Sequence, residues 1–322
     1  MDVFGLTLKQ MLTMFTLILV GYVLRKKTDL APNADKVIAK LETFVFGPAL
    51  LLHVQSSQCT IEAFQKDYVL LLYGLCIAVC AILLSYPLSG LFVPKAKGDQ
   101  QKEYSRNIYK YALTFGNYGF MGMFIIKSVF GEEMLYKHTL FTSLIEMVCL
   151  VWGMYVLVPK DQGDSFFTNL KKALLKPQII ALFAGIILGL TGLAKFIPGF
   201  VSSALKSAGD VYGPLAMILA GVIIAGYDVK QILANAKIYL LSFFRLVLLP
   251  ALILLVLAFF NTPKEIMTLA LFTFATPIGL NTIVFPTAFG GDPKTGASMV
   301  MVSSTLSMIT LPVMYLIAIV LM

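Results

Sequence analysis

The sequence predicts an all-α polytopic membrane protein of ten transmembrane helices, arranged as two inverted repeats of five. Its 322 residues are 58% hydrophobic and 13% charged, and its mean hydropathy is +0.85, which is too apolar for the surface of a soluble protein. Apolar stretches of roughly 20 residues, long enough to cross a hydrocarbon core of about 30 Å, recur along the whole chain. No separate soluble domain is expected.

Ten apolar stretches can be placed, and each is expected to form one membrane-spanning helix. They lie near residues 6–24, 37–57, 68–93, 107–130, 133–158, 177–194, 199–226, 237–259, 265–290 and 295–321. Because five is odd, the second five helices cross in the opposite sense to the first. This predicts a first repeat at 1–158, a cytoplasmic linker at 159–176 and a second repeat at 177–322. The alternative is ten unrelated helices with similar motifs by chance.

Two pairs of similar motifs favour the repeat. The segment VFGPAL at 45–50 recurs as VYGPLA at 211–216. The segment FGNYG at 115–119, with Phe-Gly-Glu at 130–132, resembles FATPIG at 274–279, with Phe-Gly-Gly-Asp at 289–292. Interrupted helices in two such halves are typical of alternating-access carriers. Gly47, Pro48, Gly213 and Pro214 of the first pair are expected to line one side of the substrate cavity.

Basic residues predict the orientation. Connections after the odd-numbered spans, with their flanks, hold 17 of the 25 lysines and arginines. The opposite side holds Lys9, Lys66, Lys127, Lys137, Lys195, Lys206 and Lys264. Basic loops tend to stay in the cytoplasm. We therefore expect a multi-pass protein of the cell membrane with both termini on the extracytoplasmic side. The net charge of +8 then reflects topology and contact with the lipid bilayer, and no nucleic-acid partner is expected.

Helix-breaking residues lie near the middle of the fourth and ninth spans. The segment GNYGFMG at 116–122 has three glycines in seven positions, and Pro277 removes a backbone donor and clashes with the preceding turn. Unwound backbone is tolerated at membrane depth only where it is buried in protein or lines a cavity. The two breaks are therefore expected to face each other across a site.

The two broken spans run in opposite directions, so the second half of each begins at the midplane with its positive end at the same place. This favours a small organic anion as substrate, with neutral donors beside it. The predicted substrate-binding residues at the breaks are Asn117, Tyr118, Gly119, Thr276, Pro277 and Asn281. The alternative is that the glycines only permit close helix packing and that Pro277 is a simple kink.

Charged residues at membrane depth are costly and usually functional or paired. Glu146 in the fifth span and Arg245 in the eighth are the candidates for coupling to H⁺ or Na⁺. The alternative for this pair is a structural ion pair, or an arginine that extends to the interface. Glu42, Lys127 and Asp210 lie nearer span ends and are expected at the interface. His138 is expected to face water near the outer surface.

Other functions have little support. The chain contains neither a phosphate-binding loop nor an HExxH zinc motif, and the Gly-x-Gly-Asp element of intramembrane aspartyl proteases is missing because residue 289 is Phe. We therefore expect no catalytic residue, metal site or cofactor. A passive anion channel remains an alternative, because broken helices also build pores. The oligomeric state, including a homodimer, stays open.

The chain resembles bacterial members of the auxin efflux carrier family, which are related to the plant PIN carriers and to the bile acid sodium symporters. The matching segments are FGPALL at 46–51, FGNYGFMG at 115–122, ATP at 275–277, FGGD at 289–292, and STLS at 304–307 with Leu-Pro at 311–312. The similarity covers the whole chain. It differs from the family pattern at Tyr118, where plant carriers place proline, and at Met123, where bacterial relatives often do.

The resemblance implies a fold in which spans one, two, six and seven form a scaffold and the other six form a moving transport domain. It implies transport of a carboxylate such as malate or malonate by a permease, with Asn117 and Pro277 at the two crossing points. A bile-acid-type, ion-coupled symporter is an alternative. The acidic ninth-span residue of those symporters has no counterpart between Thr268 and Pro286, so a copied sodium site is not expected.

Overall fold

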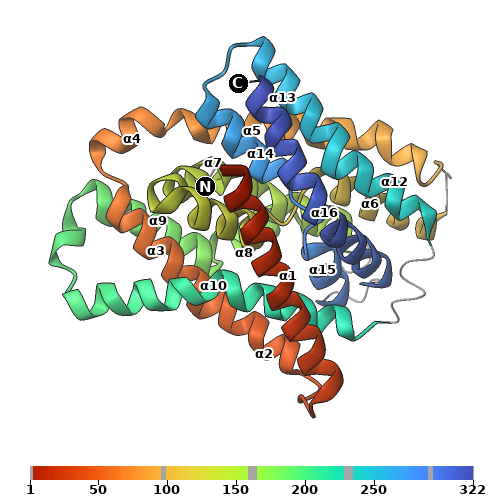
Figure 1. Cartoon of the computed structure of the whole chain (residues 1–322), viewed down its shortest axis with the longest axis horizontal. Helices are drawn as coiled ribbons and strands as arrows, with labels where there is room; N and C mark the ends of the chain where they lie inside the picture. Colours follow the sequence, from red (N-terminus) through yellow and green to blue (C-terminus); the bar gives the residue numbers. More distant parts are fainter. Residues whose placement is uncertain (1–2, 96–98, 159–164, 228–234, 289–292, 322) are drawn as a thin grey trace.

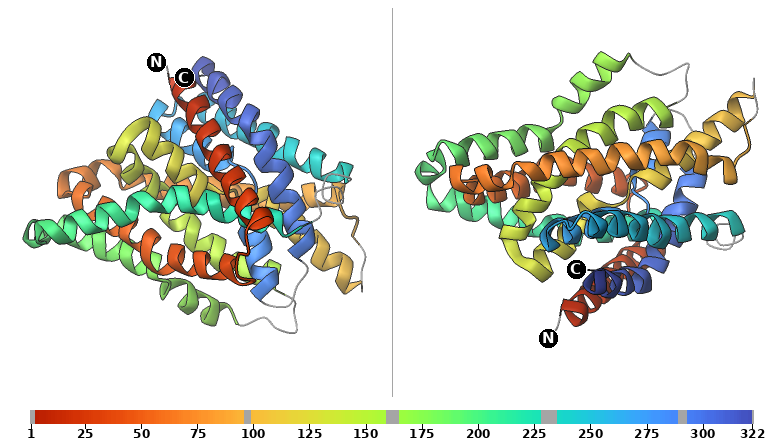
Figure 2. Two further views of the ribbon diagram at one scale, coloured as in Figure 1. Left: turned by 60° about the horizontal axis from the view of Figure 1, so that its bottom comes forward. Right: turned by 90° about the horizontal axis from the view of Figure 1, so that it is seen from above.

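The chain folds into helices joined by short connections (Figure 1). This computed structural model describes residues 3–95, 99–158, 165–227, 235–288 and 293–321. The first and last helices contact each other, and the two ends of the chain lie on the same side of the molecule (Figures 1 and 2). An even number of membrane crossings would place both termini on one side in this way.

The first half of the chain contains three long helices and several short ones. The elements are α1 (Val3–Lys27), α2 (Ala34–Leu41), η1 (Glu42–Phe46), α3 (Gly47–Gln58), α4 (Ile61–Asp67), α5 (Val69–Leu88), η2 (Ser89–Leu91), α6 (Gln100–Thr114), η3 (Tyr118–Gly122) and α7 (Met123–Leu157). Side chains cap two of the starts: Thr60 accepts from the Ala63 N–H before α4, and Asp99 accepts from the Lys102 N–H before α6.

The second half begins with an amphipathic helix and ends with the long α16. The elements are α8 (Phe166–Leu174), α9 (Pro177–Leu190), η4 (Leu193–Phe196), α10 (Gly199–Ala225), α12 (Ala236–Phe243), η5 (Phe244–Leu248), α13 (Leu249–Phe259), α14 (Lys264–Phe274), α15 (Asn281–Ala288) and α16 (Pro293–Leu321). Pro177 starts α9, where its missing N–H costs no helical hydrogen bond. The motif at 289–292 and residues 159–164 of the predicted linker lie outside the described residues.

Seven helical stretches in the described part of the chain are long and apolar enough to cross a membrane. They are Phe4–Lys27, Ala34–Gln58, Ile61–Leu91, Tyr118–Leu157, Gly199–Ala225, Ala236–Phe259 and Pro293–Leu321. A helix pair bent by 60°, Phe167–Leu174 with Pro177–Leu190, would make eight. The protein is therefore an all-helical, multi-pass membrane protein, whereas the predicted count of ten is not reached by this measure.

The difference in count has a structural reason. The predicted ninth span is divided into α14 and α15, and each piece is too short to cross alone. The predicted fourth span loses its first part to α6, while its second part joins the fifth span in α7. Within α7 only Gly131 leaves the helical conformation, with φ of 87°. This residue marks the corner between the part of α7 that belongs to the predicted fourth span and the part that belongs to the fifth.

Two groups of helices can be distinguished by their packing. α1 packs along α10, and α3 packs along both α9 and α10. The second group consists of α5, α6, α7 and α12 to α16, which contact one another extensively. The repeated motifs face each other in the first group, because a Cβ atom on Gly47 of α3 would lie 3.0 Å from the Tyr212 ring of α10. The groups meet where α3 and α10 approach α7 and η3.

Candidate functional site

Two interrupted helices cross at the centre of the second group. α6 ends at Thr114 and η3 begins at Tyr118, while α14 ends at Phe274 and α15 begins at Asn281. The segments between them are not helical and form an isolated antiparallel bridge between Gly116 and Ile278. The predicted breaks at 116–119 and 276–279 thus lie side by side.

Backbone hydrogen bonds hold this crossing together. The Asn117 N–H donates to the Pro277 carbonyl at 2.7 Å, and the Gly279 N–H donates to the Phe115 carbonyl at 3.4 Å. Because proline cannot donate, the Pro277 position offers only its carbonyl, which Asn117 uses. Each unwound segment therefore supplies hydrogen-bond partners for backbone groups of the other, as burial in a membrane protein requires.

Glycine is needed at position 116 because the other segment approaches it so closely. A Cβ atom there would lie 2.9 Å from the Thr276 carbonyl oxygen, and closer still to the Thr276 hydroxyl and the Arg245 guanidinium. By contrast, a Cβ atom on Gly119 would meet nothing within 4 Å. The first glycine thus serves the crossing itself, whereas the second faces open space.

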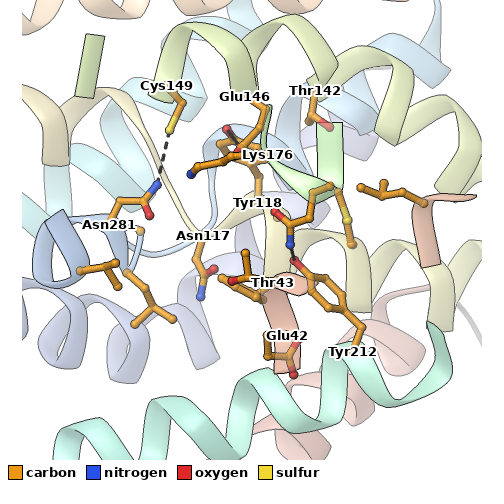
Figure 3. A pocket seen from close by; sticks show the side chains of 18 of the residues that line it. Glu42, Thr43, Asn117, Tyr118, Thr142, Glu146, Cys149, Lys176, Tyr212 and Asn281 are labelled. Carbon is orange, nitrogen blue, oxygen red and sulfur yellow. Dashed lines mark hydrogen bonds between the residues drawn. The ribbon is translucent and has the colours of Figure 1, made fainter. Parts of the chain in front are cut away.

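A cavity of about 220 Å³ lies against the crossing, between the two helix groups. The crossing contributes Gly116, Asn117, Tyr118, Gly119, Phe120, Gly279, Leu280 and Asn281, and α7 adds Thr139, Thr142, Ser143, Glu146 and Cys149. The facing wall comes from α2, η1, α9 and α10 and includes Gln178. Glu42, Thr43 and Tyr212 of this wall are labelled in Figure 3. Both helix starts of the crossing, at Tyr118 and Asn281, therefore border the cavity.

Polar side chains at the cavity are linked by hydrogen bonds. The Tyr118 hydroxyl donates to Glu146 Oε2 at 2.7 Å. Asn281 Nδ2 donates to the Tyr111 hydroxyl at 3.0 Å and approaches Cys149 Sγ at 3.7 Å (Figure 3). Asn117 is buried at the crossing, with 7% of its surface exposed. These contacts fix the side chains of Tyr118 and Asn281 around the space where a solute would lie.

The predicted site residues fall into three sets. Asn117, Tyr118, Gly119, Asn281 and Glu146 line the cavity. Gly213 lines a second cavity, of about 290 Å³, on the other side of Tyr212. The remaining six predicted residues line neither of these two cavities: Gly47, Pro48, Pro214, Thr276, Pro277 and Arg245. Pro277 and Thr276 instead build the crossing, and Gly47 permits close packing of α3 on Tyr212.

Arg245 lies behind the crossing and not beside Glu146. The residue is 1% exposed, its guanidinium lies close to Gly116, and no ion pair joins it to Glu146 among the described residues. Its Nε and one Nη atom have no hydrogen-bond partner within this part of the chain. α6 and α14 end beside it, and the negative end of a helix stabilises a cation. The structure thus gives no support to the Glu146–Arg245 ion pair.

Two further predictions about charged and polar residues need correction. His138 is fully buried, and its Nε2 atom lies 3.4 Å from the Tyr118 carbonyl oxygen, so it does not face water. Glu42 is 1% exposed and lines the cavity, so it is not interfacial. A histidine or glutamate near a span end can be covered by a neighbouring helix, and sequence depth alone does not reveal this. Lys127 and Asp210, by contrast, form a partly exposed ion pair.

The cavity also contains residues that the sequence reasoning did not single out, among them Gln178, Lys176 and Tyr212. Tyr212 belongs to the VYGPLA motif, which pointed to the neighbouring Gly213 and Pro214 instead. As for metals, the described residues contain no group of three His, Cys, Asp or Glu side chains that could hold an ion. The lining combines these polar side chains with a larger share of apolar surface.

Comparison with known protein families decides the class of this chain. The sequence profile of a family described as membrane transport proteins matches residues 6–315. The chain belongs to the auxin efflux carrier family. No curated protein sequence matches it. This auxin efflux carrier family member is thus a membrane transporter, and the cavity at its crossing is the candidate substrate site.

Proposed function

We propose that this protein is a secondary transporter, a permease that moves a small organic anion across the cell membrane by alternating access. A carboxylate such as malate or malonate is the substrate class that fits best. The main support is the position of the 220 Å³ cavity, which touches both helix starts of the crossing and the opposite helix group. A solute held there would contact both groups, and their relative movement would carry it.

The helix starts explain the choice of an anion. The first N–H groups of a helix have no intrahelical acceptor, and the helix dipole adds a partial positive charge there. α15 begins at Asn281, and the helical run of η3 and α7 begins at Tyr118, so both positive ends border the cavity. Asn117 and Asn281 supply neutral donors. In this proposal Gly119 lets the anion approach the backbone closely.

The architecture behind this proposal is a pair of inverted five-span repeats, 1–158 and 177–322, joined by the linker 159–176. The antiparallel crossing of one break from each repeat supports it. α1, the second span (α2, η1 and α3), α9 and α10 would form the scaffold, and α5, α6, α7 and α12 to α16 would form the transport domain. The excess of basic residues favours a cytoplasmic linker and extracytoplasmic termini.

Glu146 remains the proposed coupling residue of the transport domain. Its carboxylate accepts from Tyr118, the first residue after the break, so a change in the charge of Glu146 would act directly on the crossing. A Glu146→Gln variant should alter the dependence of uptake on the proton or sodium gradient. Unchanged dependence on both gradients would remove Glu146 from the coupling mechanism.

Uptake of labelled malate and malonate into proteoliposomes tests the proposal. We expect saturable uptake, accelerated by unlabelled substrate on the other side of the membrane, because a carrier exchanges its substrate. Asn117→Ala should reduce uptake at least tenfold by removing a donor from the site. Asn107→Ala is the matched control, since Asn107 accepts from Lys110 on α6, before the break.

Two results would overturn this proposal in different ways. Flux that rises linearly with concentration and shows no exchange would indicate a passive anion channel. Full activity of Asn117→Ala would place the substrate elsewhere than at the crossing. A thermal-shift screen of small carboxylates with the purified protein offers a test of binding that does not depend on transport, because a ligand of the folded state raises its stability.

A further inference from the structure

A buried carboxyl group without a partner lies on the scaffold side of the cavity. Glu42 is the first residue of the π-helical turn η1, and 1% of its surface is exposed. Neither of its carboxyl oxygens has a hydrogen-bond partner among the described residues. Its side chain borders the same cavity as Asn117 and Glu146 (Figure 3). The π-helical turn inserts one extra residue per turn, and such turns often mark functional sites.

The surroundings of Glu42 do not compensate a negative charge. α9 contributes Gln178, whose amide donates to the Tyr212 hydroxyl of α10 at 3.5 Å. Lys176, just before α9, also lines the cavity, but its Nζ lies 5.7 Å from the centre of the Phe285 ring and forms no ion pair with Glu42 among the described residues.

The other charged groups on the helices packed against η1 are directed elsewhere. On α2, Lys36 and Lys40 are exposed and Asp35, which is half-buried, is not a cation. On α10, Asp210 pairs with Lys127 and Lys206 pairs with Glu132. On α3, the imidazole of His53 lies 3.9 Å from Glu132. Glu42 therefore has no cation of its own within the described structure.

An unpaired carboxylate in such a place is costly. Moving an ionised carboxyl from water into a protein interior carries an effective penalty of several kcal/mol, and the membrane interior adds to it. A proton on the group removes most of that penalty, so the neutral acid is the stable form in this conformation. A metal cation is a weaker explanation, because no cluster of acidic, His or Cys side chains surrounds Glu42 in the described residues.

The charge of the proposed substrate leads one step further. Glu146 already places one carboxylate at the cavity, and an ionised Glu42 on the opposite wall would place a second. Two carboxylates facing a bound anion repel it, whereas a protonated Glu42 removes one charge and offers an O–H donor. The same group thus changes from repelling the anion to donating a hydrogen bond to it.

We propose that Glu42 is a proton-binding residue that controls anion binding in the cavity: the anion binds when Glu42 carries a proton and is rejected when Glu42 is ionised. This inference rests on the proposed transport of an organic anion. It deepens that function by linking each anion bound to one proton held on the scaffold. Above the pH at which Glu42 ionises, anion affinity should fall by up to about tenfold per pH unit.

The proton can be observed without any substrate. Infrared spectroscopy of the purified protein distinguishes the C=O stretch of a protonated carboxyl from that of a carboxylate. We expect a protonated-carboxyl band at neutral pH in the wild type, and its loss in Glu42→Gln, which has the shape of the neutral acid. Glu62→Gln is the matched control, because Glu62 is exposed in the first turn of α4, and the band should stay. A band unchanged in Glu42→Gln would overturn the proposal.

Anion binding provides the second measurement. Dissociation constants for malate or malonate are measured in sodium-free buffers over a pH range in which the dicarboxylate itself stays fully ionised. Because Glu146 lines the same cavity and is itself the proposed coupling residue, both chains in this comparison carry Glu146→Gln. The chain that keeps Glu42 should lose affinity as pH rises, and the chain that also carries Glu42→Gln should bind with less than a twofold change across the range. An equal pH dependence in both chains would overturn the linkage, as would a dependence on sodium in place of pH.

The two measurements separate the two proposals. If the infrared band behaves as expected but no carboxylate binds the wild type, the proposed substrate class fails and the linkage to the anion fails with it, while the proton on Glu42 stands. If anions bind and the band is unaffected by Glu42→Gln, the proposed function stands and the role of Glu42 fails. Equal melting temperatures of Glu42→Gln and the wild type at neutral pH would show that the variant is folded.

Discussion

Single residues set the geometry of the crossing, and Gly116 is the most restricted of them. Its neighbours on the other segment are the carbonyl oxygen and the hydroxyl of Thr276, two residues before Ile278, which forms the bridge with Gly116. The guanidinium of Arg245 closes the remaining side. A side chain at this position would therefore push the two segments apart.

The prediction at this scale compares two glycines three residues apart. Gly116→Ala should lower the free energy of unfolding by about 1–3 kcal/mol, the usual cost of forcing a methyl group into a filled space. It should also weaken anion binding, since Asn117 would shift with its neighbour. Thermal unfolding of the purified variant measures the first effect, and ligand-induced thermal shift measures the second.

Gly119→Ala is the control, because its Cβ atom would meet nothing within 4 Å. Its unfolding temperature should equal or exceed that of the wild type, since alanine favours the helix that begins there. An equal loss of stability in both variants would show that the close approach at Gly116 is not what restricts this position.

Residue type and local sequence context could predict some members of the site but not others. Asn117 and Asn281 could be found because they flank glycine and proline breaks, and Glu146 because it is a carboxylate within an apolar span. Glu42 also lies within an apolar span, yet its burial depends on Gln178 and Tyr212, which come from the other half of the chain. Such coverage is a property of the tertiary fold, which no local pattern contains.

At the scale of helical elements, three π-helical turns stand out in the described chain. η1 contains Glu42, η3 contains Tyr118 and η5 contains Arg245. Each of these turns thus carries a buried residue at or beside the crossing or its cavity. Sequence could not predict these turns, because a π-turn depends on a shift of backbone hydrogen bonds and leaves no periodic signal in apolar residues. The breaks at Pro277 and in GNYGFMG could be predicted, because glycine and proline act through the local backbone.

Close packing of α1 on α10 gives a prediction about whole helices. A Cβ atom on Gly221 would lie 2.8 Å from the Tyr22 backbone nitrogen and would overlap the Ile18 carbonyl oxygen. Gly221→Ala should therefore reduce stability by about 1–3 kcal/mol in spite of the better helix propensity of alanine. A lower unfolding temperature in detergent is the expected observation.

The matched control lies at the start of the same helix. Gly199 has no atom within 4 Å of its Cβ position, so Gly199→Ala should change the free energy of unfolding by less than about 0.5 kcal/mol. If Gly221→Ala melted at or above the wild-type temperature, close backbone contact between α1 and α10 would not contribute to stability. Small residues at such contacts let membrane helices approach, which is how the proposed scaffold would stay rigid.

At the scale of the whole molecule, two cavities follow one another along α10. Gly209 and Asp210 line the second cavity, whereas Leu219 and Ile223 line the cavity at the crossing. Tyr212 and Met123 line both, so their side chains lie between the two spaces.

Phe120 adds to this barrier, because its ring stacks on that of Tyr212 with 5.2 Å between the ring centres. In the orientation predicted from basic residues, the first cavity lies toward the cytoplasm and the second toward the outside. Tyr212 then separates a solute at the crossing from the opposite side of the membrane.

The barrier can be tested by its removal. Tyr212→Ala should join the two cavities and allow a trapped carboxylate to leave proteoliposomes at a rate that grows linearly with its concentration, without exchange against external substrate. Tyr212→Phe keeps the ring that stacks on Phe120 and should keep saturable exchange. Since the phenylalanine variant loses only the hydroxyl that accepts from Gln178, the comparison isolates the ring as the barrier. Saturable exchange at the wild-type rate in Tyr212→Ala would mean that other side chains close this path, and a leak in both variants would assign the barrier to the hydroxyl and its hydrogen bond.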